Sequence, residues 1–195
     1  AAFGALAGAA TVQGTVSHQH IYGLLFRILW PLSASRPSAR LRLAYTEQLT
    51  ALGQQPVVLI ASPAHLKRLP DTQDWQPLSR ALRAVFSSGG ALPADAARDV
   101  LRLWGQAAIE VFGSTETGGI AWRRGDGSRT PWQPLPGVEW RLQDDVLEVR
   151  SPHLPSMAWW ATSDRAFASG DGGFQLLGRA DRIVKIEERR ISLDA

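Results

Sequence analysis

Residues 108–119 read AIEVFGSTETGG, a short apolar run followed at once by a loop of small and hydroxyl-bearing residues. Open α/β sheets bind their ligands just beyond the carboxyl ends of parallel strands, which is where such a loop would lie. Its backbone amides and hydroxyls can hold phosphate oxygens, and Glu116 offers a hard oxygen ligand for Mg²⁺. The loop matches neither the P-loop nor the dinucleotide fingerprint, and it lacks the G-x-S-x-G pattern of serine hydrolases.

Upstream, the pattern predicts a parallel sheet with crossover helices. Residues 57–61 and 84–86 are two further apolar runs, and each is followed by small or turn-forming residues. Residues 93–104 carry apolar side chains at helical spacing, with Pro93 suited to a helix start and Gly105 to its end. Strand, helix and strand at this spacing favour parallel pairing. We also expect a strand over 11–16 and a buried helix over 21–30 that ends at Pro31.

Downstream of Gly119 helical periodicity disappears and short alternating runs take its place. Turn signals such as Asp-Gly and Pro-Gly separate them. The expected strands are residues 138–142, 146–150, 174–177, 183–186 and 190–193. The predicted fold class is therefore α/β, with a parallel βαβ subdomain and flanking helices over 1–118, followed by an antiparallel, β-barrel-like subdomain.

Composition excludes several classes of protein. The chain has 195 residues, 45% hydrophobic and 20% charged, which is typical of a globular protein rather than a disordered or fibrous one. Its net charge of +3 is too small for an electrostatic nucleic-acid interface. The absence of cysteine excludes disulfides and cysteine-ligated zinc, and it fits a reducing compartment, so we expect a cytoplasmic protein. Polar residues interrupt the N-terminal apolar stretch, so neither a signal peptide nor a membrane span is predicted.

Two histidines offer an alternative kind of site. His18 and His20 would share one face of a strand and could bind a metal, but no third ligand lies near them in the sequence. The pattern therefore does not favour a zinc centre.

Five segments, in order, resemble motifs of the adenylate-forming enzymes, the superfamily of acyl- and aryl-CoA synthetases, peptide-synthetase adenylation domains and luciferases. The loop VFGSTETG at 111–118 resembles the Tyr-Gly-Ser-Thr-Glu motif of that family. The other four are SHQHIYG at 17–23, SSGGALP at 87–93, TSD at 162–164 and GRADRIVKI at 178–186. Each match is weak alone, but five in the right order are specific. The resemblance extends from about His18 to the end of the chain, and it indicates a fragment of the large N-terminal domain.

The resemblance implies an ATP-dependent ligase that joins a fatty or aryl acid to a thiol through an acyl-adenylate. Glu116 would ligate Mg²⁺ and Thr115 would bond a phosphate oxygen, which gives both a catalytic role. The carboxylic acid would bind near His20, Gly23 and Gly89. ATP and AMP would be held by the following residues: Gly89, Gly90, Ala91, Phe112, Gly113, Thr115, Asp164 and Arg179. Of these, Asp164 would accept from the ribose hydroxyls, Arg179 would bond ribose or phosphate, and Phe112 would stack on adenine.

The last motif implies a moving domain. Asp181 would be its hinge, and Lys185 would act in a second, thioester-forming conformation, which places 119–179 in a β-rich subdomain and 180–195 at the start of a truncated C-terminal domain. The acceptor would be coenzyme A or the phosphopantetheine of an acyl carrier protein. The chain begins at Ala1 without a methionine, and the family's phosphate-binding loop and adenylation lysine would lie outside it. We therefore expect the fragment alone to be inactive.

Departures from the family pattern leave a second reading open. Phe112 replaces the usual tyrosine, Ser163 replaces a glycine, and Glu187-Glu188 stands where the family has a glycine-containing turn. The alternative is a non-catalytic nucleotide-binding or protein-interaction module that retains the adenylation fold.

Overall fold

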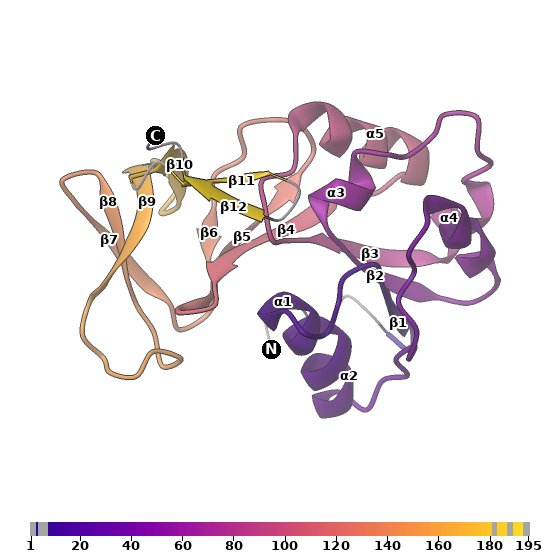
Figure 1. Ribbon diagram of the computed structural model, residues 1–195, viewed down its shortest axis with the longest axis horizontal. Coiled ribbons are helices and arrows are strands. Elements are labelled where there is room, and N and C mark those ends of the chain that lie inside the picture. The colour runs from indigo at the N-terminus through magenta and orange to yellow at the C-terminus, as the bar shows by residue number, and fades with distance from the viewer. Residues whose placement is uncertain (1–2, 4–7, 181–182, 187–188, 193–195) are drawn as a thin grey trace. The chain divides into compact units, whose positions relative to one another are not determined.

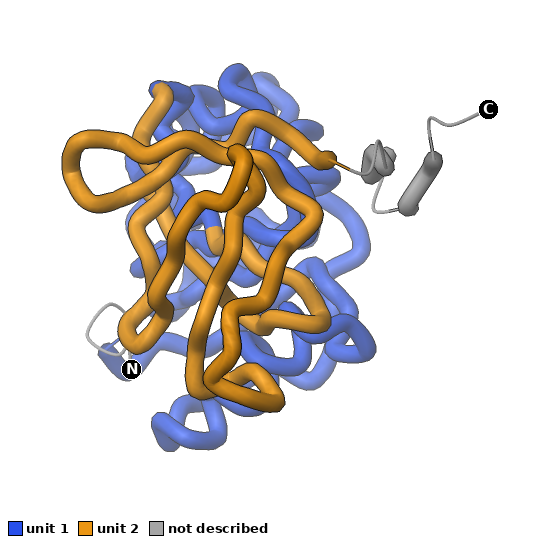
Figure 2. Tube along the Cα trace, turned by 90° about the vertical axis from the view of Figure 1, so that its left-hand side faces the viewer, with its two compact units in different colours: residues 1–110, 124–128 blue, residues 111–123, 129–195 orange. Residues whose placement is uncertain are grey.

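The computed structural model describes residues 3, 8–180, 183–186 and 189–192. The chain forms two compact units, which Figure 2 shows in different colours: residues 1–110 with 124–128, and residues 111–123 with 129–195. These units describe how the chain packs, and not which parts fold or move as domains. The predicted division into 1–118, 119–179 and 180–195 therefore stays a prediction.

The first unit is built on a parallel sheet, as the sequence predicts. Its strands are β1 (Thr11–Gly14), β2 (Val57–Ala61), β3 (Leu82–Ser87) and the first residues of β4 (Ala108–Ser114). Every neighbouring pair among them is parallel. All five residues of β2 are buried, which is typical of a parallel strand covered on both faces.

Helices cover both faces of this parallel sheet (Figure 1). On one face, side chains such as Leu59 and Val85 pack with Val100 and Trp104 in a buried apolar cluster. On the other face, the ring of Phe86 meets Phe26 and Trp30 at centroid distances of 5.1 and 5.8 Å. The helices are α1 (Ile21–Gly23), the π-helix η2 (Leu24–Leu29), α2 (Trp30–Ser33), the 3-10 helix η3 (Thr46–Gln54), α3 (Pro63–Leu66), α4 (Gln76–Ala81) and α5 (Ala94–Trp104).

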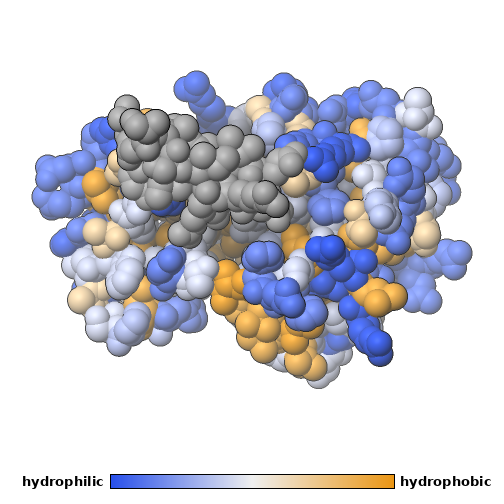
Figure 3. All heavy atoms as spheres, viewed as in Figure 1, coloured by the Kyte–Doolittle hydropathy of each residue, from blue (hydrophilic) through white to orange (hydrophobic). Residues whose placement is uncertain are grey.

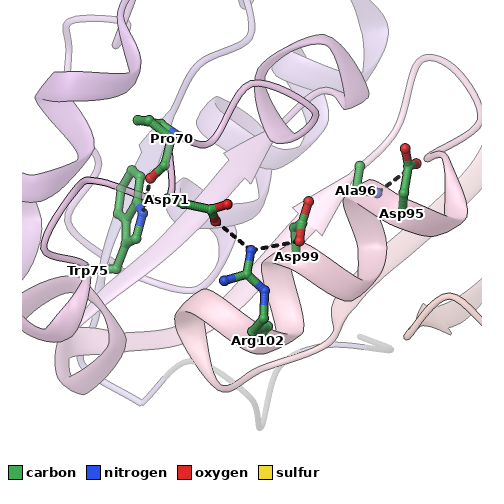
Figure 4. A network of polar contacts seen from close by, with 7 residues as sticks. All are labelled: Pro70, Asp71, Trp75, Asp95, Ala96, Asp99 and Arg102. Atoms are coloured by element: carbon green, nitrogen blue, oxygen red, sulfur yellow. Dashed lines mark hydrogen bonds and ion pairs between the residues drawn. The ribbon is translucent and has the colours of Figure 1, made fainter.

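Helix α5 begins after Pro93 and ends at Trp104, just before Gly105, so its prediction is confirmed to within one residue. Its exposed face carries an ion-pair network (Figure 4), in which Arg102 donates to Asp71 at 2.5 Å and to Asp99 at 2.8 Å. The Trp75 indole N–H in the same region donates to the carbonyl of Pro70 at 3.0 Å. Since the three charged groups are solvent-exposed, this network orients the segment before α4 more than it stabilises the fold.

The helix expected over 21–30 continues past Pro31 to Ser33, so that boundary was wrong. Pro31 lies in the first turn of α2, where its missing N–H costs nothing. The helix is also only partly buried: Leu29 is 47% and Leu32 71% exposed. Hydrophobic atoms gather where Figure 1 places α1 and α2 (Figure 3).

The second unit is antiparallel β, as the alternating pattern predicts. β5 (Gly118–Gly125) pairs with β6 (Gln133–Pro134), and a four-stranded sheet has the order β10-β9-β8-β7. Ile120, Leu147, Val149 and Phe174 are among the residues of its buried core. The remaining strands are β7 (Glu139–Gln143), β8 (Val146–Arg150), β9 (Trp160–Ala168), β10 (Phe174–Arg179), β11 (Ile183–Ile186) and β12 (Arg189–Ser192).

Strand β9 was not predicted, although its nine residues make it the longest strand described. Its sequence WATSDRAFA has no clear alternation, but β8 and β10 pair with it on both sides. Tertiary pairing therefore overrides weak local propensity there. Among the described residues, none of the helices has the length and apolar character needed to cross a membrane.

Candidate functional site

The loop between β4 and β5 is closed by its own polar side chains. Thr117 is only 3% exposed, and its hydroxyl lies 3.0 Å from that of Ser114. The Thr117 hydroxyl also accepts from the Ser114 amide at 3.2 Å and donates to the Gly118 carbonyl at 3.1 Å. A side chain at Gly113 is impossible without a shift, because a Cβ there would lie 2.1 Å from the Gly118 oxygen. The loop is therefore held in one conformation.

This closure directs Thr115 and Glu116 outward, and both are exposed at the turn. The structure thus brings together the two residues predicted to act on phosphate and Mg²⁺. Sequence reasoning missed Thr117, whose role is to fix the loop. Its signal was the Ser-x-x-Thr spacing, since such hydroxyls bond nearby backbone groups in turns.

Phe112 lies half-buried at the end of β4. Its ring meets Trp132 at a centroid distance of 5.5 Å and Phe174 at 6.2 Å. An adenine base could therefore contact only the part of this ring that stays exposed. Stacking of Phe112 on adenine stays a prediction.

Asp164 and Arg179 are direct partners across the antiparallel strands β9 and β10. Residues opposite each other in such a pair point to the same face of the sheet, so the two predicted ribose residues lie side by side. The Asp164 amide donates to the Thr162 hydroxyl at 3.1 Å, and that hydroxyl donates to the Leu147 carbonyl at 2.8 Å. The Ala180 amide donates to the Ser163 carbonyl at 2.8 Å. The segment TSD is thus fixed between its neighbours despite the serine.

A tryptophan that sequence reasoning did not select supports the start of β9. The guanidinium groups of Arg141 and Arg150 lie over the ring of Trp159 at 4.4 and 4.7 Å. Arg141 also pairs with Glu148 at 2.6 Å, and Arg150 pairs with Glu139. Cation–π contacts of this kind are favourable, so the stack steadies the chain just before Asp164.

In the first unit, two predicted loops follow parallel strands. Residues 17–20 lie between β1 and α1, and His20 is the exposed residue preceding that helix. Gly89, Gly90 and Ala91 follow β3, and Gly89 has a φ of +92°, which favours glycine. Because both loops leave the carboxyl ends of parallel strands, they lie along the same edge of the sheet.

Tyr22 adds a buried polar group to this stretch. Its hydroxyl oxygen is buried and has no hydrogen-bond partner among the described residues. Its ring packs on Phe26 at a centroid distance of 5.1 Å. Burial raises the pKa of the Tyr22 phenol well above its usual value, so this hydroxyl stays protonated even at an alkaline pH at which an exposed tyrosine ionises.

The predicted site residues therefore form two groups, one in each unit. The first group is His20, Gly23, Gly89, Gly90 and Ala91, and the second is Phe112, Gly113, Thr115, Glu116, Asp164 and Arg179. Asp181 lies outside the described residues, and Lys185 is described only by the backbone of β11. Where the structure describes the chain, no three His, Asp or Glu side chains are placed to share a metal ion.

Comparison with known proteins gives a family match and several relatives. A family model described as "AMP-binding enzyme" matches residues 5–155. The chain is 30% identical over 190 residues to a 4-coumarate–CoA ligase of Rhodobacter capsulatus, covering 90% of this chain and 42% of the relative. It is 26% identical over 159 residues to the 2-succinylbenzoate–CoA ligase of Salmonella typhimurium, covering 70% and 34%.

A solved structure agrees with these matches. A malonyl-CoA ligase with methylmalonyl-CoA and AMP bound has a TM-score of 0.79 and 26% identity, covering 95% of this chain and 47% of that one. The chain thus spans less than half the length of these relatives. The α/β fold expected from the sequence is confirmed.

Proposed function

The chain belongs to the family of AMP-binding enzymes, and from this premise we propose that its protein is an ATP-dependent acid–thiol ligase. The protein would join a carboxylic acid to AMP with release of pyrophosphate, and would then pass the acyl group to a thiol. A carboxylate is a poor electrophile and repels the triphosphate that it must attack. The reaction therefore needs charge neutralisation at the phosphates and a fixed geometry between the reactants.

The observation that carries this proposal is the closed loop after β4. Inside this loop the hydroxyls of Ser114 and Thr117 form a hydrogen bond with each other. Thr115 and Glu116 are exposed at the surface of the loop. Mg²⁺ is usually held by one or two carboxylates together with substrate phosphates, so a single exposed glutamate fits the ion. We propose that Glu116 holds Mg²⁺ and that the Thr115 hydroxyl donates to a phosphate oxygen. The ion would supply charge stabilisation at the phosphates.

The adjacent strands β9 and β10 carry two polar side chains that could bind the ribose of ATP. Asp164 can accept hydrogen bonds from two ribose hydroxyls, while Arg179 beside it can donate to ribose or phosphate oxygens. Gly89, Gly90, Ala91 and Phe112 would contact adenine. A Cβ added at Gly89 would have no atom within 4 Å, so there is room for a ligand beside this backbone.

The acid and the acceptor complete the proposal. The carboxylic acid, a fatty or aryl acid, would bind near His20, Gly23 and Gly89, beside the loop that follows β1. Coenzyme A or the phosphopantetheine of an acyl carrier protein would take the acyl group, with Lys185 serving this second step. A cytoplasmic location belongs to the same proposal.

The test is ATP–pyrophosphate exchange by the full-length protein that contains this chain. Suitable acids are 4-coumarate, 2-succinylbenzoate and methylmalonate, which match the names of its relatives. Glu116→Gln keeps the shape of the side chain and removes its charge, so exchange is expected to fall by about 100-fold or more. Glu47→Gln, which changes an exposed carboxylate in η3, is the matched control. Exchange by Glu116→Gln within a few-fold of wild type would contradict the role of Glu116.

The departures at Phe112 and Ser163 support one other candidate, a non-catalytic nucleotide-binding module. The same assay separates the two. A protein that binds ATP but gives no exchange with any acid tested would favour the module over the ligase.

A further inference from the structure

Arg27 is a buried charge inside the π-helix η2, and only 2% of the residue is exposed. Its guanidinium donates to the carbonyl of Val16 at 2.6 Å, and to those of Ala39 and Leu41 at 3.3 Å each. Among the described residues, no carboxylate forms an ion pair with it, and the first acidic residue of the chain is Glu47. Burying an unpaired charge costs a large free energy unless hydrogen bonds compensate it. The hydrogen bonds to these carbonyls therefore hold Arg27 in place.

The neighbours of Arg27 are shaped to admit its side chain. A Cβ at Gly14 would lie 2.4 Å from the Arg27 Cδ atom, so the arginine stem crosses β1 directly over this glycine. The Ser38 hydroxyl donates to the Arg27 carbonyl at 2.7 Å. Arg27 is thus fitted against the last residues of β1 and against the segment 38–41. Burial, and then the positive charge of Arg42, lower the pKa of this guanidinium.

The first turn of α1 packs on the loop of residues 17–20, which follows Val16. A Cβ at Gly23 would lie 2.0 Å from the Ser17 carbonyl oxygen, so the helix packs directly on the loop backbone. The His20 amide donates to this same carbonyl at 3.4 Å, and the Gln19 amide donates to the Ser17 hydroxyl at 3.2 Å. Arg27 holds Val16 and Gly23 holds Ser17. The residues that lead to His20 therefore have little freedom.

We propose that Arg27 is a positioning residue that fixes the loop of residues 17–20 and, through it, the acid-binding half of the site. The inference rests on the proposed function, since that function assigns the acid to this loop. Arg27 touches no substrate in this scheme, because it is buried and both terminal nitrogens of its guanidinium donate to main-chain carbonyls. A π-helical segment is rare and is often found at functional sites, which agrees with the position of Arg27 in η2.

The first experiment measures kcat/KM for the acid and the KM for ATP in the full-length protein. Arg27→Met keeps the stem length and removes all the donors, whereas Arg27→Lys keeps the charge and fewer donors. With 4-coumarate, 2-succinylbenzoate or methylmalonate, whichever the wild type activates, Arg27→Met is expected to lower kcat/KM for the acid by about 100-fold. The KM for ATP is expected to stay within about two-fold of the wild-type value. Arg27→Lys is expected to have a kcat/KM for the acid between those of the wild type and Arg27→Met. Arg40→Met, at an exposed arginine of the same segment, is the control.

The second experiment needs no activity. Hydrogen exchange in the full-length protein is expected to become faster over residues 15–24 in Arg27→Met and to be unchanged over β9 and β10. The proposal would be overturned if Arg27→Met lost affinity for the acid and for ATP equally. It would also be overturned if hydrogen exchange over residues 15–24 were unchanged in this variant. If Arg27→Met does not fold, Arg27→Lys carries both tests.

The two experiments also separate this inference from the proposed function. A wild-type protein that activates none of the acids would count against the ligase. Faster hydrogen exchange over residues 15–24 in Arg27→Met would still support the role of Arg27 in fixing the loop.

Discussion

Asp164 lies opposite Arg179 across two hydrogen-bonded strands, so a carboxylate and a guanidinium are presented on one face of the sheet. If Asp164 binds the ribose, its replacement removes hydrogen bonds to a charged acceptor, which are worth about 1.5–3 kcal/mol. Asp164→Ala is therefore expected to raise the KM for ATP by about 10- to 100-fold and to leave the KM for the acid nearly unchanged.

Deoxynucleotides provide the control for Asp164. The wild type should bind ATP more tightly than 2′-deoxy-ATP and 3′-deoxy-ATP, and the Asp164→Ala protein should lose most of this preference. Equal discrimination by both proteins would show that Asp164 does not hold the sugar.

Single residues differ in how well the sequence marks them. Thr115, Glu116 and Asp164 were selected because each occupies a fixed place in a short motif. Arg27 is not marked in this way, since the carbonyls that hold it lie 11, 12 and 14 residues away and any residue supplies a carbonyl. The arginine stack on Trp159 depends equally on tertiary packing, which no local pattern records.

At the scale of elements, the turn between β4 and β5 depends on the absence of a side chain at Gly113. An alanine there would place its Cβ 2.1 Å from the Gly118 oxygen, so the two strands would have to separate. Gly113→Ala is expected to destabilise the protein by about 1–3 kcal/mol, the usual cost of overpacking. It should also weaken nucleotide binding, because Thr115 and Glu116 would move with the loop.

Gly170 provides the matched control for Gly113. It is also in the second unit, and a Cβ at that position would meet no atom within 4 Å. Urea unfolding and the KM for ATP should therefore change in Gly113→Ala and stay near wild type in Gly170→Ala. Equal stability of the two variants would mean that the loop is not constrained as described.

The elements themselves were predicted where the hydrophobic pattern is strong. The runs at 57–61, 146–150 and 183–186 coincide with β2, β8 and β11, because a short continuous or alternating apolar run between turn signals is typical of a strand. Helix α4 and strand β9 were missed, since neither sequence contains such a run. The π-helical turn of η2 was missed as well, because a helical pattern does not distinguish i→i+4 from i→i+5 hydrogen bonds.

At the scale of the whole molecule, the order of element types was enough to predict the fold class. Strands alternating with helices gave the parallel sheet of the first unit, and strands joined by tight turns gave the antiparallel sheet of the second. The site is harder to predict at this scale. The residues proposed for it are found in the sequences of both units, and two of them, Asp181 and Lys185, follow β10 in the chain.

The proposed ligase performs two reactions, and a rotation of the region after Asp181 would let one set of residues serve each of them. A hinge residue absorbs a large change in φ and ψ while the elements on both sides stay rigid. Proline at position 181 would fix φ near about −65° and remove the amide hydrogen, so it would hold one conformation. Lys185 lies in β11 opposite Arg190 of β12, so Arg190→Ala is a matched control for loss of a positive charge on the same strand pair.

Asp181→Pro and Lys185→Ala should therefore share one phenotype in the full-length protein, because the first blocks the rotation and the second removes a charge used only after it. Both should keep ATP–pyrophosphate exchange and lose acyl transfer from a preformed adenylate to coenzyme A or carrier phosphopantetheine. Arg190→Ala should retain both reactions. If Lys185→Ala slows exchange and transfer by the same factor, Lys185 does not act selectively in the second step. If Arg190→Ala also loses transfer alone, the effect belongs to the strand pair rather than to Lys185.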